Sequence, residues 1–455
     1  MKQEANVFIH RRDFRVQDNT ALLTLVEKYP NIPVLHCFFF NPSQIEPAKN
    51  RFYNKNCVEF MVQGLKSLRD QLDGHLYFFY GPDASCLHSI MKGCTINAVA
   101  WNSDYTPFAR SRDGDLAALL DSKGIEHIEG QDYTLFPMGY IKPYYVYTPF
   151  YKRCLKLAEH IRPPEEMRRH RVFDRPLAGT IKDIDRFYGE PNLQLRSKGG
   201  REEALAILKR VKGGAFKSYD HVRDYPAKDG TTHLSAYIKF GCVSVREVFE
   251  CFRRYCGLRH GLVRELLWRE FYAHATWNNP GVLGGKPFKK VKLQWERRPA
   301  WHSAVMKGRT GFPLVDAAIR ELLTTGWMGN RVRMVVASFI TKDLALDWRT
   351  YERELFGRHL IDYDPSTNCH SWQGVASVGI DSAPYWRVMN PWRQLERFDP
   401  ECTYVKRWVP ELAAVDPHKI REWRLYAKDG ISRYPAPIVD HEERVKRYLA
   451  MWKGT

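Results

Sequence analysis

Residues 7–40 read VFIHRRDFRVQDNTALLTLVEKYPNIPVLHCFFF, and this stretch decides the fold. The apolar runs Val7–His10 and Ile32–Phe40 have the length and composition of buried strands. Between them, Thr20–Lys28 has the apolar spacing of an amphipathic helix. A strand, a helix and a strand in this order predict two parallel strands joined by a crossover helix.

The same alternation continues to about residue 136. We expect strands at His75–Tyr80, Ile96–Trp101 and Ile125–Glu129, and helices at Val58–Leu72, Ala84–Met91 and Asp113–Ser122. The sequence therefore predicts an α/β N-terminal domain with a five-stranded, mostly parallel, doubly wound sheet. It lacks G-x-G-x-x-G after the first strand and G-x-x-x-x-G-K-[ST], which disfavours a dinucleotide-binding dehydrogenase and a P-loop enzyme.

Beyond residue 136 the pattern changes twice. Prolines such as Pro143, Pro163 and Pro176 interrupt residues 137–200, which also contain a basic run around Arg169. Helical periodicity dominates from Glu202 onward. We therefore predict an α/β domain at residues 1–136, a connector at 137–200 and an all-α domain at 201–455. Two domains suit a chain of 455 residues, because single cores stop growing near about 250–300 residues.

The composition favours a nucleic-acid partner. Seventy Lys and Arg against 52 Asp and Glu give a formal charge of +18, and such an excess attracts polyanions. No apolar run reaches the length of a membrane span and no signal-peptide pattern is present, so we expect a soluble, intracellular protein that binds no membrane. The cysteines form no C-x-x-C pair and the histidines lack ligand spacing, so we expect reduced thiols and no metal.

Tryptophan is concentrated in the predicted helical domain. Of 13 tryptophans, only Trp101 precedes residue 260. Indoles stack on flat ligands and closely spaced indoles relay electrons, so this concentration indicates a role beyond packing. For any single tryptophan, core packing is the alternative.

One segment combines a carboxylate, an indole and a guanidinium. In ELLWREFY (265–272), a helix places Glu265, Trp268 and Arg269 on one face, because they are three and four residues apart. An exposed ion pair packed under a tryptophan is the alternative for this face.

Two further segments mix apolar and polar groups. In GWMGNRVRM (326–334), helical spacing relates four residues: Trp327, Asn330, Arg331 and Met334. A buried, unpaired amide costs about 1–3 kcal/mol, so Asn330 indicates a ligand that pairs with it. The segment LIDYDPSTNCHSWQ (360–373) predicts a polar loop between helices, and a capped turn is its simpler interpretation.

These segments, together with GTTHLSAY (230–237), residues 8–20 and YPAPIVDH (434–441), resemble the photolyase and cryptochrome family nearly end to end. Within the family, the chain is most similar to class I-type cyclobutane pyrimidine dimer DNA photolyases. The resemblance implies an all-α C-terminal domain that binds FAD. The implied flavin contacts are Tyr219, Thr231, Thr232, Leu234, Ser235, Arg269, Trp327, Asn330, Arg333, Asp362, Asp364 and Asn368.

The resemblance also assigns roles within this set. Thr231 and Thr232 match residues that contact the flavin pyrophosphate. Arg333 and Asp362 match an ion pair beside the isoalloxazine ring, and Asn368 matches the residue that faces flavin N5. An amide at that position suits a fully reduced, anionic flavin.

Three tryptophans, Trp295, Trp348 and Trp372, match the family relay that carries electrons from the surface to the photoexcited flavin. The residues that match lesion or DNA contacts are Arg223, Glu265, Trp268, Asn330, Arg331, Met334 and Arg387. The (6-4) photolyases have histidines where Asn330 and Met334 stand, so the resemblance disfavours that substrate.

One departure concerns the lesion. Many dimer photolyases have a second aromatic residue after Trp-Gln, whereas Gly374 follows Trp372 and Gln373 here. Stacking contributes about 1–3 kcal/mol per base in single-strand binders, so we hypothesise that Trp386 or Trp392 compensates. The stretch from Asp362–Asn368 through Val378–Asp381 also resembles the DASH cryptochromes, which act mainly on single-stranded DNA.

The sequence thus predicts a deoxyribodipyrimidine photo-lyase, a carbon–carbon lyase that repairs pyrimidine dimers by light-driven electron transfer from reduced FAD. Two alternatives remain: a cryptochrome-type blue-light photoreceptor, and a DASH-like photolyase that prefers single strands. We expect UV-damaged DNA as the partner, a monomer, and a cytoplasmic or nuclear location. Family members often bind an antenna chromophore (folate, deazaflavin or a second flavin), which this sequence does not identify.

Overall fold

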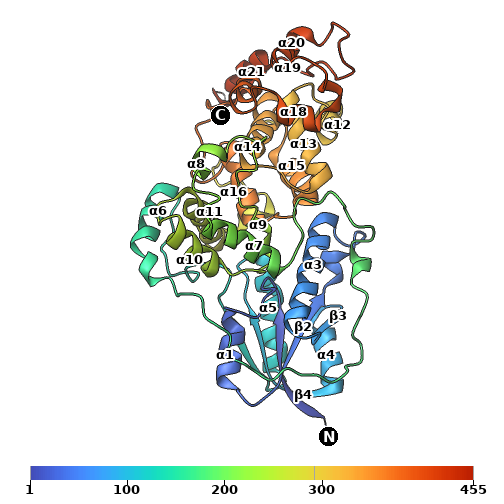
Figure 1. Cartoon of the computed structure of the whole chain (residues 1–455), viewed down its shortest axis with the longest axis vertical. Coiled ribbons are helices and arrows are strands. Elements are labelled where there is room, and N and C mark those ends of the chain that lie inside the picture. Colours follow the sequence, from blue (N-terminus) through green and yellow to red (C-terminus); the bar gives the residue numbers. More distant parts are fainter. Residues whose placement is uncertain (1, 292, 454–455) are drawn as a thin grey trace. The chain divides into compact units, whose positions relative to one another are not determined.

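The central strand of the sheet is the first one in the chain. The computed structural model describes residues 2–291 and 293–453. Its five strands are β1 (Gln3–His10), β2 (Val34–Phe40), β3 (Leu76–Tyr80), β4 (Cys94–Asn102) and β5 (Glu126–Gly130). They form one sheet in the order β3-β2-β1-β4-β5, and every neighbouring pair is parallel. The predicted five-stranded, doubly wound sheet is confirmed (Figure 1).

Helices cover both faces of this sheet. They are α1 (Thr20–Lys28), the four-residue α2 (Pro42–Ile45), α3 (Lys55–Gln71), α4 (Asp83–Gly93) and α5 (Pro107–Asp121). Phe8 and Ala100 pack with α1 on one face, whereas Val7 and Val99 pack with α4 and α5 on the other. This alternation follows from the two-residue period of strands.

The chain divides into two compact units, each made of three stretches. The first unit contains Met1–Pro191, Ser197–Lys217 and Thr232–Pro280, and the second contains Asn192–Arg196, Ser218–Thr231 and Gly281–Thr455. The predicted domain limits at residues 136 and 200 stay a prediction. Residues 137–200 pair with the sheet by single bridges, Val34 with Val172 and Phe79 with Thr180.

The first unit adds helices to the sheet. These are α6 (Tyr147–Lys156), α7 (Arg201–Lys212), α9 (Ser235–Lys239), α10 (Val245–Tyr255) and α11 (Gly261–Asn278), with short 3-10 turns at Ala158–His160 and Asp185–Phe187. A capping box of Ser244 and Glu247 begins α10. Arg246 in the first turn binds Asp18 at 3.0 Å and Asp132 at 2.6 Å, and so fixes α10 to the loops after β1 and β5.

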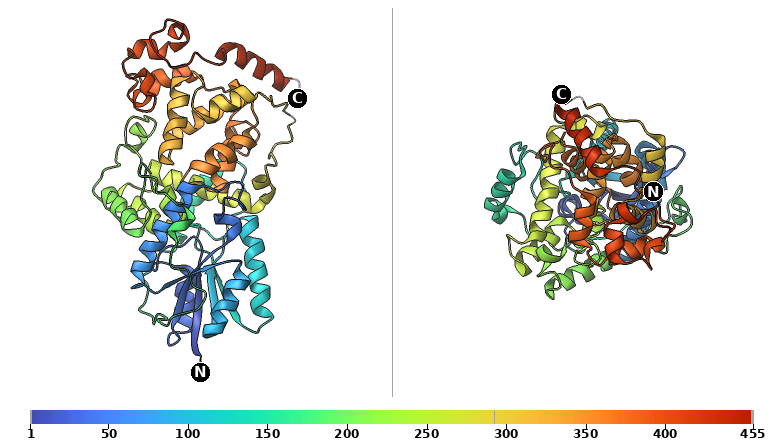
Figure 2. Two further views of the ribbon diagram at one scale, coloured as in Figure 1. Left: turned by 90° about the vertical axis from the view of Figure 1, so that its right-hand side faces the viewer. Right: turned by 90° about the horizontal axis from the view of Figure 1, so that it is seen from above.

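Within the described residues of the second unit, every regular element is a helix, and loops connect them. Its helices are α8 (Tyr219–Val222), α12 (Pro299–Met306), α13 (Pro313–Thr325), α14 (Asn330–Ser338), α15 (Trp348–Tyr351), α16 (Pro365–Val375), α17 (Pro391–Phe398), α18 (Thr403–Trp408), α19 (Pro417–Arg421), α20 (Trp423–Tyr426) and α21 (His441–Lys453). Two π-helical turns, Phe339–Asp343 and Glu352–Gly357, lie before and after α15. Figure 2 shows helices α12 to α21 of this unit, coloured from yellow to red, in two further views. The predicted helical C-terminal half is confirmed.

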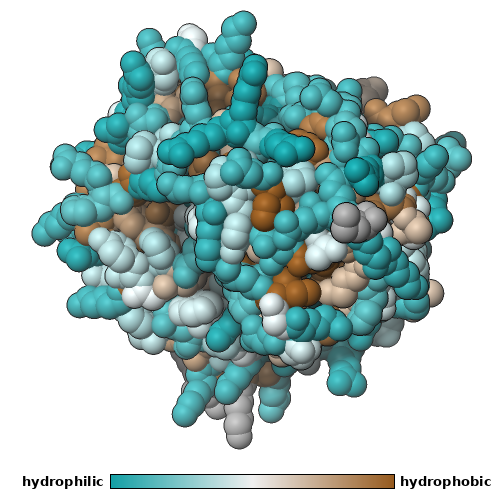
Figure 3. Space-filling model, turned by 90° about the horizontal axis from the view of Figure 1, so that it is seen from below, coloured by the Kyte–Doolittle hydropathy of each residue, from teal (hydrophilic) through white to brown (hydrophobic). Residues whose placement is uncertain are grey.

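Among the described residues, no helix combines the length and apolarity that crossing a membrane requires. The face drawn in Figure 3 is mostly hydrophilic, with apolar residues in small separate patches. Scattered apolar side chains of this kind are normal on a folded protein.

Candidate functional site

An ion pair lies at the start of α14 in the second unit. Arg333 donates from Nη2 to both carboxylate oxygens of Asp362, at 3.1 and 3.0 Å. Its Nε donates to the Met328 carbonyl at 2.6 Å, and its guanidinium lies 5.1 Å from the centre of the Trp327 ring. The Asp362 side chain is only 5% exposed. Partly buried and held at both ends, this pair is a rigid donor and acceptor for a polar ring.

Asn368 is fixed by its own amide. It lies on α16, whose first turn is capped by Asp364, which accepts a hydrogen bond from the Thr367 N–H at 3.0 Å. The Asn368 Nδ2 donates to Glu352 Oε1 at 2.9 Å and to the Glu352 carbonyl at 3.2 Å. Tyr363 donates to the same Glu352 oxygen at 2.9 Å. Burial raises the pKa of Glu352, although these hydrogen bonds oppose the rise.

The Asn368 carbonyl oxygen is therefore turned away from Glu352. No donor reaches this oxygen within residues 2–291 and 293–453, and Asn368 is 8% exposed. The oxygen is not among the fully buried side-chain atoms without a partner, so solvent reaches it, and an unpaired, accessible amide oxygen can accept from a ligand N–H. Reduced flavin carries a hydrogen on N5, which makes FAD a chemically suitable partner for this oxygen.

The three predicted relay tryptophans belong to one core. Trp372 is 1% exposed and Trp348 is 2% exposed, whereas Trp295 is partly buried against the same cluster. The Trp372 ring meets the Phe356 ring edge-on at 4.9 Å. The structure thus gives the three indoles increasing exposure from Trp372 to Trp295.

In the first unit, α11 presents Glu265 and Trp268 one turn apart, as predicted. The Trp268 ring stacks face to face on Tyr147, with ring centres 3.6 Å apart and planes 7° apart. Tyr147 in turn donates its hydroxyl to the Arg264 carbonyl at 2.9 Å. One face of Trp268 is therefore covered and its orientation is fixed.

Arg269 has close partners in the same unit. Its guanidinium lies 3.9 Å from the centre of the Tyr133 ring and its Nη1 is 3.3 Å from Glu270 Oε1. Glu270 is fully buried and accepts hydrogen bonds from the backbone of Leu135 at 2.9 Å and Phe136 at 3.4 Å. Burial raises the pKa of Glu270 to about 7, against the opposing charge of Arg269.

Two details of the second predicted segment were wrong. Gly326 ends α13 in the left-handed conformation, and Trp327 lies in the turn before α14, not on the helix. Asn330 is the first residue of α14 and is exposed, so the argument from a buried amide does not apply to it. Arg331 donates to Asp224 at 2.7 Å and covers the Phe398 ring at 4.6 Å, whereas Met334 is half-buried.

The remaining predicted contacts are divided between the units. Thr232, Leu234 and Ser235 lie at the start of α9 in the first unit. Tyr219 and Thr231 belong to the second unit, where the Arg223 guanidinium lies 5.5 Å from the centre of the Tyr219 ring. Arg387 is exposed in the loop before α17.

Gly374 has open space around it. A Cβ built at this residue meets no atom within 4 Å. Trp392 is 8% exposed and packs on Phe312 at 4.8 Å, so it belongs to the core. Trp386 is 64% exposed beside Tyr385. Of the two hypothesised substitutes, only Trp386 projects from its unit.

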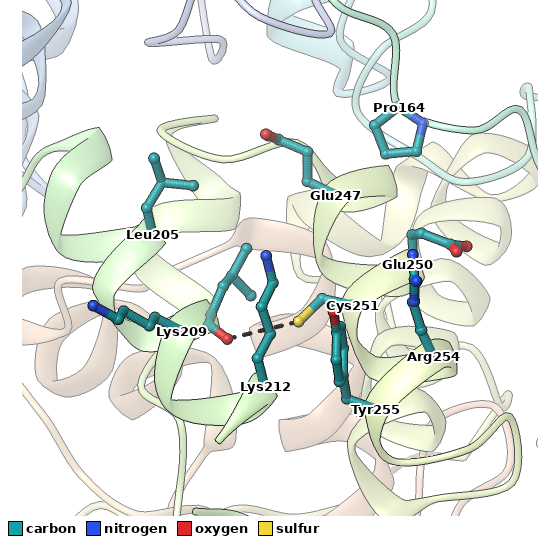
Figure 4. A pocket seen from close by; sticks show the side chains of 10 residues that line it. Pro164, Leu205, Lys209, Lys212, Glu247, Glu250, Cys251, Arg254 and Tyr255 are labelled. Carbon is teal, nitrogen blue, oxygen red and sulfur yellow. Dashed lines mark hydrogen bonds between the residues drawn. The ribbon is translucent and has the colours of Figure 1, made fainter. Parts of the chain in front are cut away.

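A groove of about 500 Å³ between α7 and α10 lies apart from these residues (Figure 4). It is lined by Leu205, Lys209, Lys212, Glu250 and Tyr255 among others. The Cys251 thiol in it donates to the Leu208 carbonyl at 3.8 Å, and burial raises its pKa to about 11. The groove contains no residue that the sequence analysis selected, and its thiol is protonated at neutral pH.

Sequence reasoning missed three supporting residues. Tyr147 backs Trp268 from 121 positions away in the chain, and Glu352 orients Asn368 from a π-helical turn. No local pattern identifies either, because each acts through a tertiary contact. Tyr133, whose ring lies below the Arg269 guanidinium, was missed for the same reason.

Comparisons with known proteins agree with this geometry. Residues 6–168 match the family model described as DNA photolyase, and residues 262–454 match the FAD binding domain of DNA photolyase. The deoxyribodipyrimidine photo-lyase of Synechococcus sp. is 33% identical over 98% of this chain and 96% of its own length. The deoxyribodipyrimidine photo-lyase of Escherichia coli is 32% identical over 98% of this chain and 97% of its own length.

Solved structures give the same result. The archaeal photolyase of Sulfolobus tokodaii, which contains two FAD molecules, is 34% identical, has a TM-score of 0.87 and matches 100% of both chains. A class III photolyase of Agrobacterium tumefaciens is 28% identical, with a TM-score of 0.90 over 100% of this chain and 98% of its own. An α/β sheet unit followed by a helical flavin-binding half defines a class of flavoproteins. The chain belongs to the DNA photolyase family.

Proposed function

We propose that the chain is a deoxyribodipyrimidine photo-lyase that splits cyclobutane pyrimidine dimers in DNA with light. FAD, when bound, reduced and excited by blue or near-ultraviolet light, supplies the electron that splits the cyclobutane ring and recovers it afterwards. The observation that carries the proposal is the acceptor set of the second unit, where Arg333 fixes Asp362 and Glu352 fixes Asn368. Preorganised polar groups of this kind hold a ring system without reorganisation.

The cofactor-binding residues have distinct tasks. Asp362 accepts from ring N–H groups while Arg333 holds its carboxylate in place, and the Asn368 carbonyl accepts at N5. The hydroxyls of Thr231, Thr232 and Ser235 donate to the pyrophosphate oxygens, as hydroxyls do in anion sites. The proposed set also includes Tyr219, Leu234, Arg269, Trp327, Asn330 and Asp364.

The lesion-binding residues come from α11 and α14. Glu265 hydrogen-bonds the dimer and steadies its radical anion, and Trp268 offers the ring face that Tyr147 leaves open. Asn330 and Met334 complete the lesion side. Extruding a dimer from the helix is inexpensive because it stacks poorly, and Arg223, Arg331 and Arg387 hold the phosphates.

A repair assay tests the proposal. Fully reduced protein is mixed with an oligonucleotide that contains one thymine dimer and is illuminated, and the return of absorbance near 260 nm is followed in single and double strands. We expect repair in the light and none in the dark. If reduced, flavin-loaded protein repairs neither form, the proposal is wrong.

The open space at Gly374 favours a second candidate within the same chemistry, a DASH-like preference for single strands. Without the additional stacking ring, the site pulls a dimer from a stable duplex less effectively. The same assay decides this, since repair of single strands at least tenfold faster than of duplex would support it. A cryptochrome-type photoreceptor is the alternative if light changes the flavin but repairs nothing.

The other assignments are proposals of the same kind. We expect a monomer, measurable by light scattering, in the compartment that contains the DNA. A second chromophore is expected to appear, if bound, as a second absorbing species on denaturation and chromatography. Its identity follows from that spectrum.

A further inference from the structure

Exposed apolar side chains, two of them aromatic, gather in one short stretch of the first unit. Tyr140 is 55% exposed, Tyr145 47% and Val146 50%, and they lie just before α6. Elsewhere in the described chain, exposed aromatic side chains such as Tyr80 and Phe108 are isolated from one another in sequence. Large apolar side chains exposed side by side usually mark an interaction surface.

Unpaired cations lie in the same stretch. Lys142, Lys152, Arg153 and Lys156 are all exposed, and none forms an ion pair with a carboxylate in the part of the chain that the structure describes. By contrast, Lys66 pairs with Asp185 at 2.6 Å and Arg253 pairs with Glu250 at 2.8 Å, also at the surface of the first unit. From Tyr140 to His160 the only carboxylate is Glu159.

Helix α6 has two different faces. Tyr147, Phe150 and Cys154 are buried and face α11, where Phe150 packs on Phe271 at 5.4 Å. Lys152, Arg153 and Lys156 lie on the rest of the helix, with Lys152 and Lys156 one turn apart. Figure 1 shows α6 at the edge of its unit, alongside α11. The outer face therefore remains open.

Ring contacts lead inward from this surface to Trp268. The half-buried Tyr151 lies 5.8 Å from the buried Tyr147 with the two ring planes tilted by 31°, and Tyr147 stacks on Trp268. Packed rings therefore join α6 to the residue that we assign to the dimer. Rings interleaved with unpaired cations are how single-strand binders hold bases and phosphates together.

We infer that residues 140–156 bind the unpaired DNA strand that flanks the dimer, with Tyr140 and Tyr145 stacking on bases and Lys152, Arg153 and Lys156 neutralising phosphates. This inference rests on the proposed function for the identity of the strand. A duplex offers no free base to the two tyrosines, whereas an unpaired strand uses both the rings and the charges. The surface therefore favours single-stranded over double-stranded DNA.

The test measures binding of a lesion-free oligothymidylate in the dark by fluorescence anisotropy. The charge-reversal variant is Lys152→Glu/Arg153→Glu/Lys156→Glu. The matched control is Lys209→Glu/Arg210→Glu/Lys212→Glu, which makes the same charge change in the last turn of α7 at residues that are also exposed. Retained FAD absorbance and circular dichroism show that both variants are folded.

We expect the α6 variant to bind at least tenfold more weakly, with the slope of log K against log salt reduced by about 2, because each single-strand phosphate contact contributes about 0.7. The α7 control should lose less than threefold. Equal losses in both variants would mean that only net charge matters, and would overturn the inference.

A second pair of measurements isolates the rings. Tyr140→Ser/Tyr145→Ser should weaken oligothymidylate binding about fivefold or more, and leave lesion-free duplex binding unchanged. An equal loss on duplex, or no loss on the single strand, contradicts stacking. Binding to vesicles of anionic phospholipid is measured as well. If the α6 variant loses vesicle binding but keeps DNA binding, the surface binds lipid and the inference is wrong.

These experiments use undamaged DNA without light, so they do not depend on repair. If the wild-type protein repairs no dimer but the α6 variant loses strand binding as expected, the proposed function is wrong and the strand-binding surface stands. If repair occurs and the α6 variant binds the single strand as the wild type does, the inference about residues 140–156 is wrong and the proposed function stands.

Discussion

At the scale of single residues, Asn368 shows how one amide is set by its neighbour. Its Nδ2 is used by Glu352, so its oxygen faces away from that carboxylate. Beside the proposed flavin ring, which becomes negative on reduction, an amide adds no charge. A carboxylate would place its single negative charge near both that ring and Glu352.

We predict that Asn368→Asp keeps FAD bound but lowers repair at least tenfold. Two carboxylates about 4 Å apart repel by about 4 kcal/mol at an effective dielectric constant of 20, and the pKa of one of them must rise. Repair per bound FAD is the measurement. Asn97→Asp, a change of the same kind on β4, is the control, and equal repair by both variants contradicts the assignment.

Glu270 gives a prediction for pH. Because burial raises its folded pKa to about 7, above an unfolded value near 4.5, the folded state binds more protons between these limits. Its contribution to stability is present below about pH 4.5 and is lost as the pH rises through 7. Glu270→Gln keeps the acceptor for the Leu135 N–H. It should remove the decline of about 1–3 kcal/mol in the free energy of unfolding that the wild type shows as the pH rises.

Denaturation in urea at pH 5 and pH 7.5 measures this difference. The wild type should lose more stability than Glu270→Gln between the two values. Parallel losses in both proteins would show that Glu270 is ionised throughout.

At the scale of elements, buried ion pairs fix α10. Burial alone would raise the pKa of Asp132, but the charges of Arg15 and Arg246 hold it well below its ordinary value. Its ionised form therefore contributes stability above its unfolded pKa, near 4, and that contribution is lost as the pH falls. Both arginines are almost fully buried, so neither has water to replace the carboxylate.

Asp132→Asn should destabilise the first unit by about 3–5 kcal/mol at neutral pH, because it leaves two buried guanidiniums without their common partner. Asp185→Asn, at the exposed pair with Lys66, should cost less than about 1 kcal/mol. Hydrogen exchange of the β1 and β5 amides measures the destabilisation caused by each of the two substitutions. Similar costs would mean that the buried network is not cooperative.

The sequence predicted elements better than contacts. Helix α1 has the limits that its apolar periodicity predicts. Its start is set locally, because Asn19 caps it and accepts from the Leu22 N–H. Strands β1 and β4 begin earlier than their apolar runs, since Gln3 and Cys94 pair across the sheet whatever their polarity. Stacking of Tyr147 on Trp268 and the hold of Glu352 on Asn368 depend on the tertiary fold, and no local pattern contains them.

At the scale of the whole molecule, the tryptophans of the proposed relay lie in or against the core. Trp372, Trp348 and Trp295 belong to the cluster that stabilises the second unit, and their exposure increases in that order. We predict that Trp348→Phe blocks light-driven reduction of oxidised FAD by an external thiol. Protein reduced chemically beforehand should still repair dimers, because the relay serves only to reload the flavin.

Trp301→Phe is the matched control, since Trp301 packs against the same cluster and lies outside the assigned relay. Absorbance of the flavin during illumination is the measurement. Full photoreduction in Trp348→Phe, or equal loss in both variants, would contradict the assignment.

The path of the chain has a consequence for synthesis on the ribosome. The polypeptide passes from one unit to the other after residues 191, 196, 217, 231 and 280. The first unit is therefore fully translated by residue 280, while the early pieces 192–196 and 218–231 must wait for partners made later. Thr231 and Thr232, adjacent in the sequence, thus enter units that mature at different times, and a nascent chain that stalls midway holds half of its threonine pair in an unfinished unit.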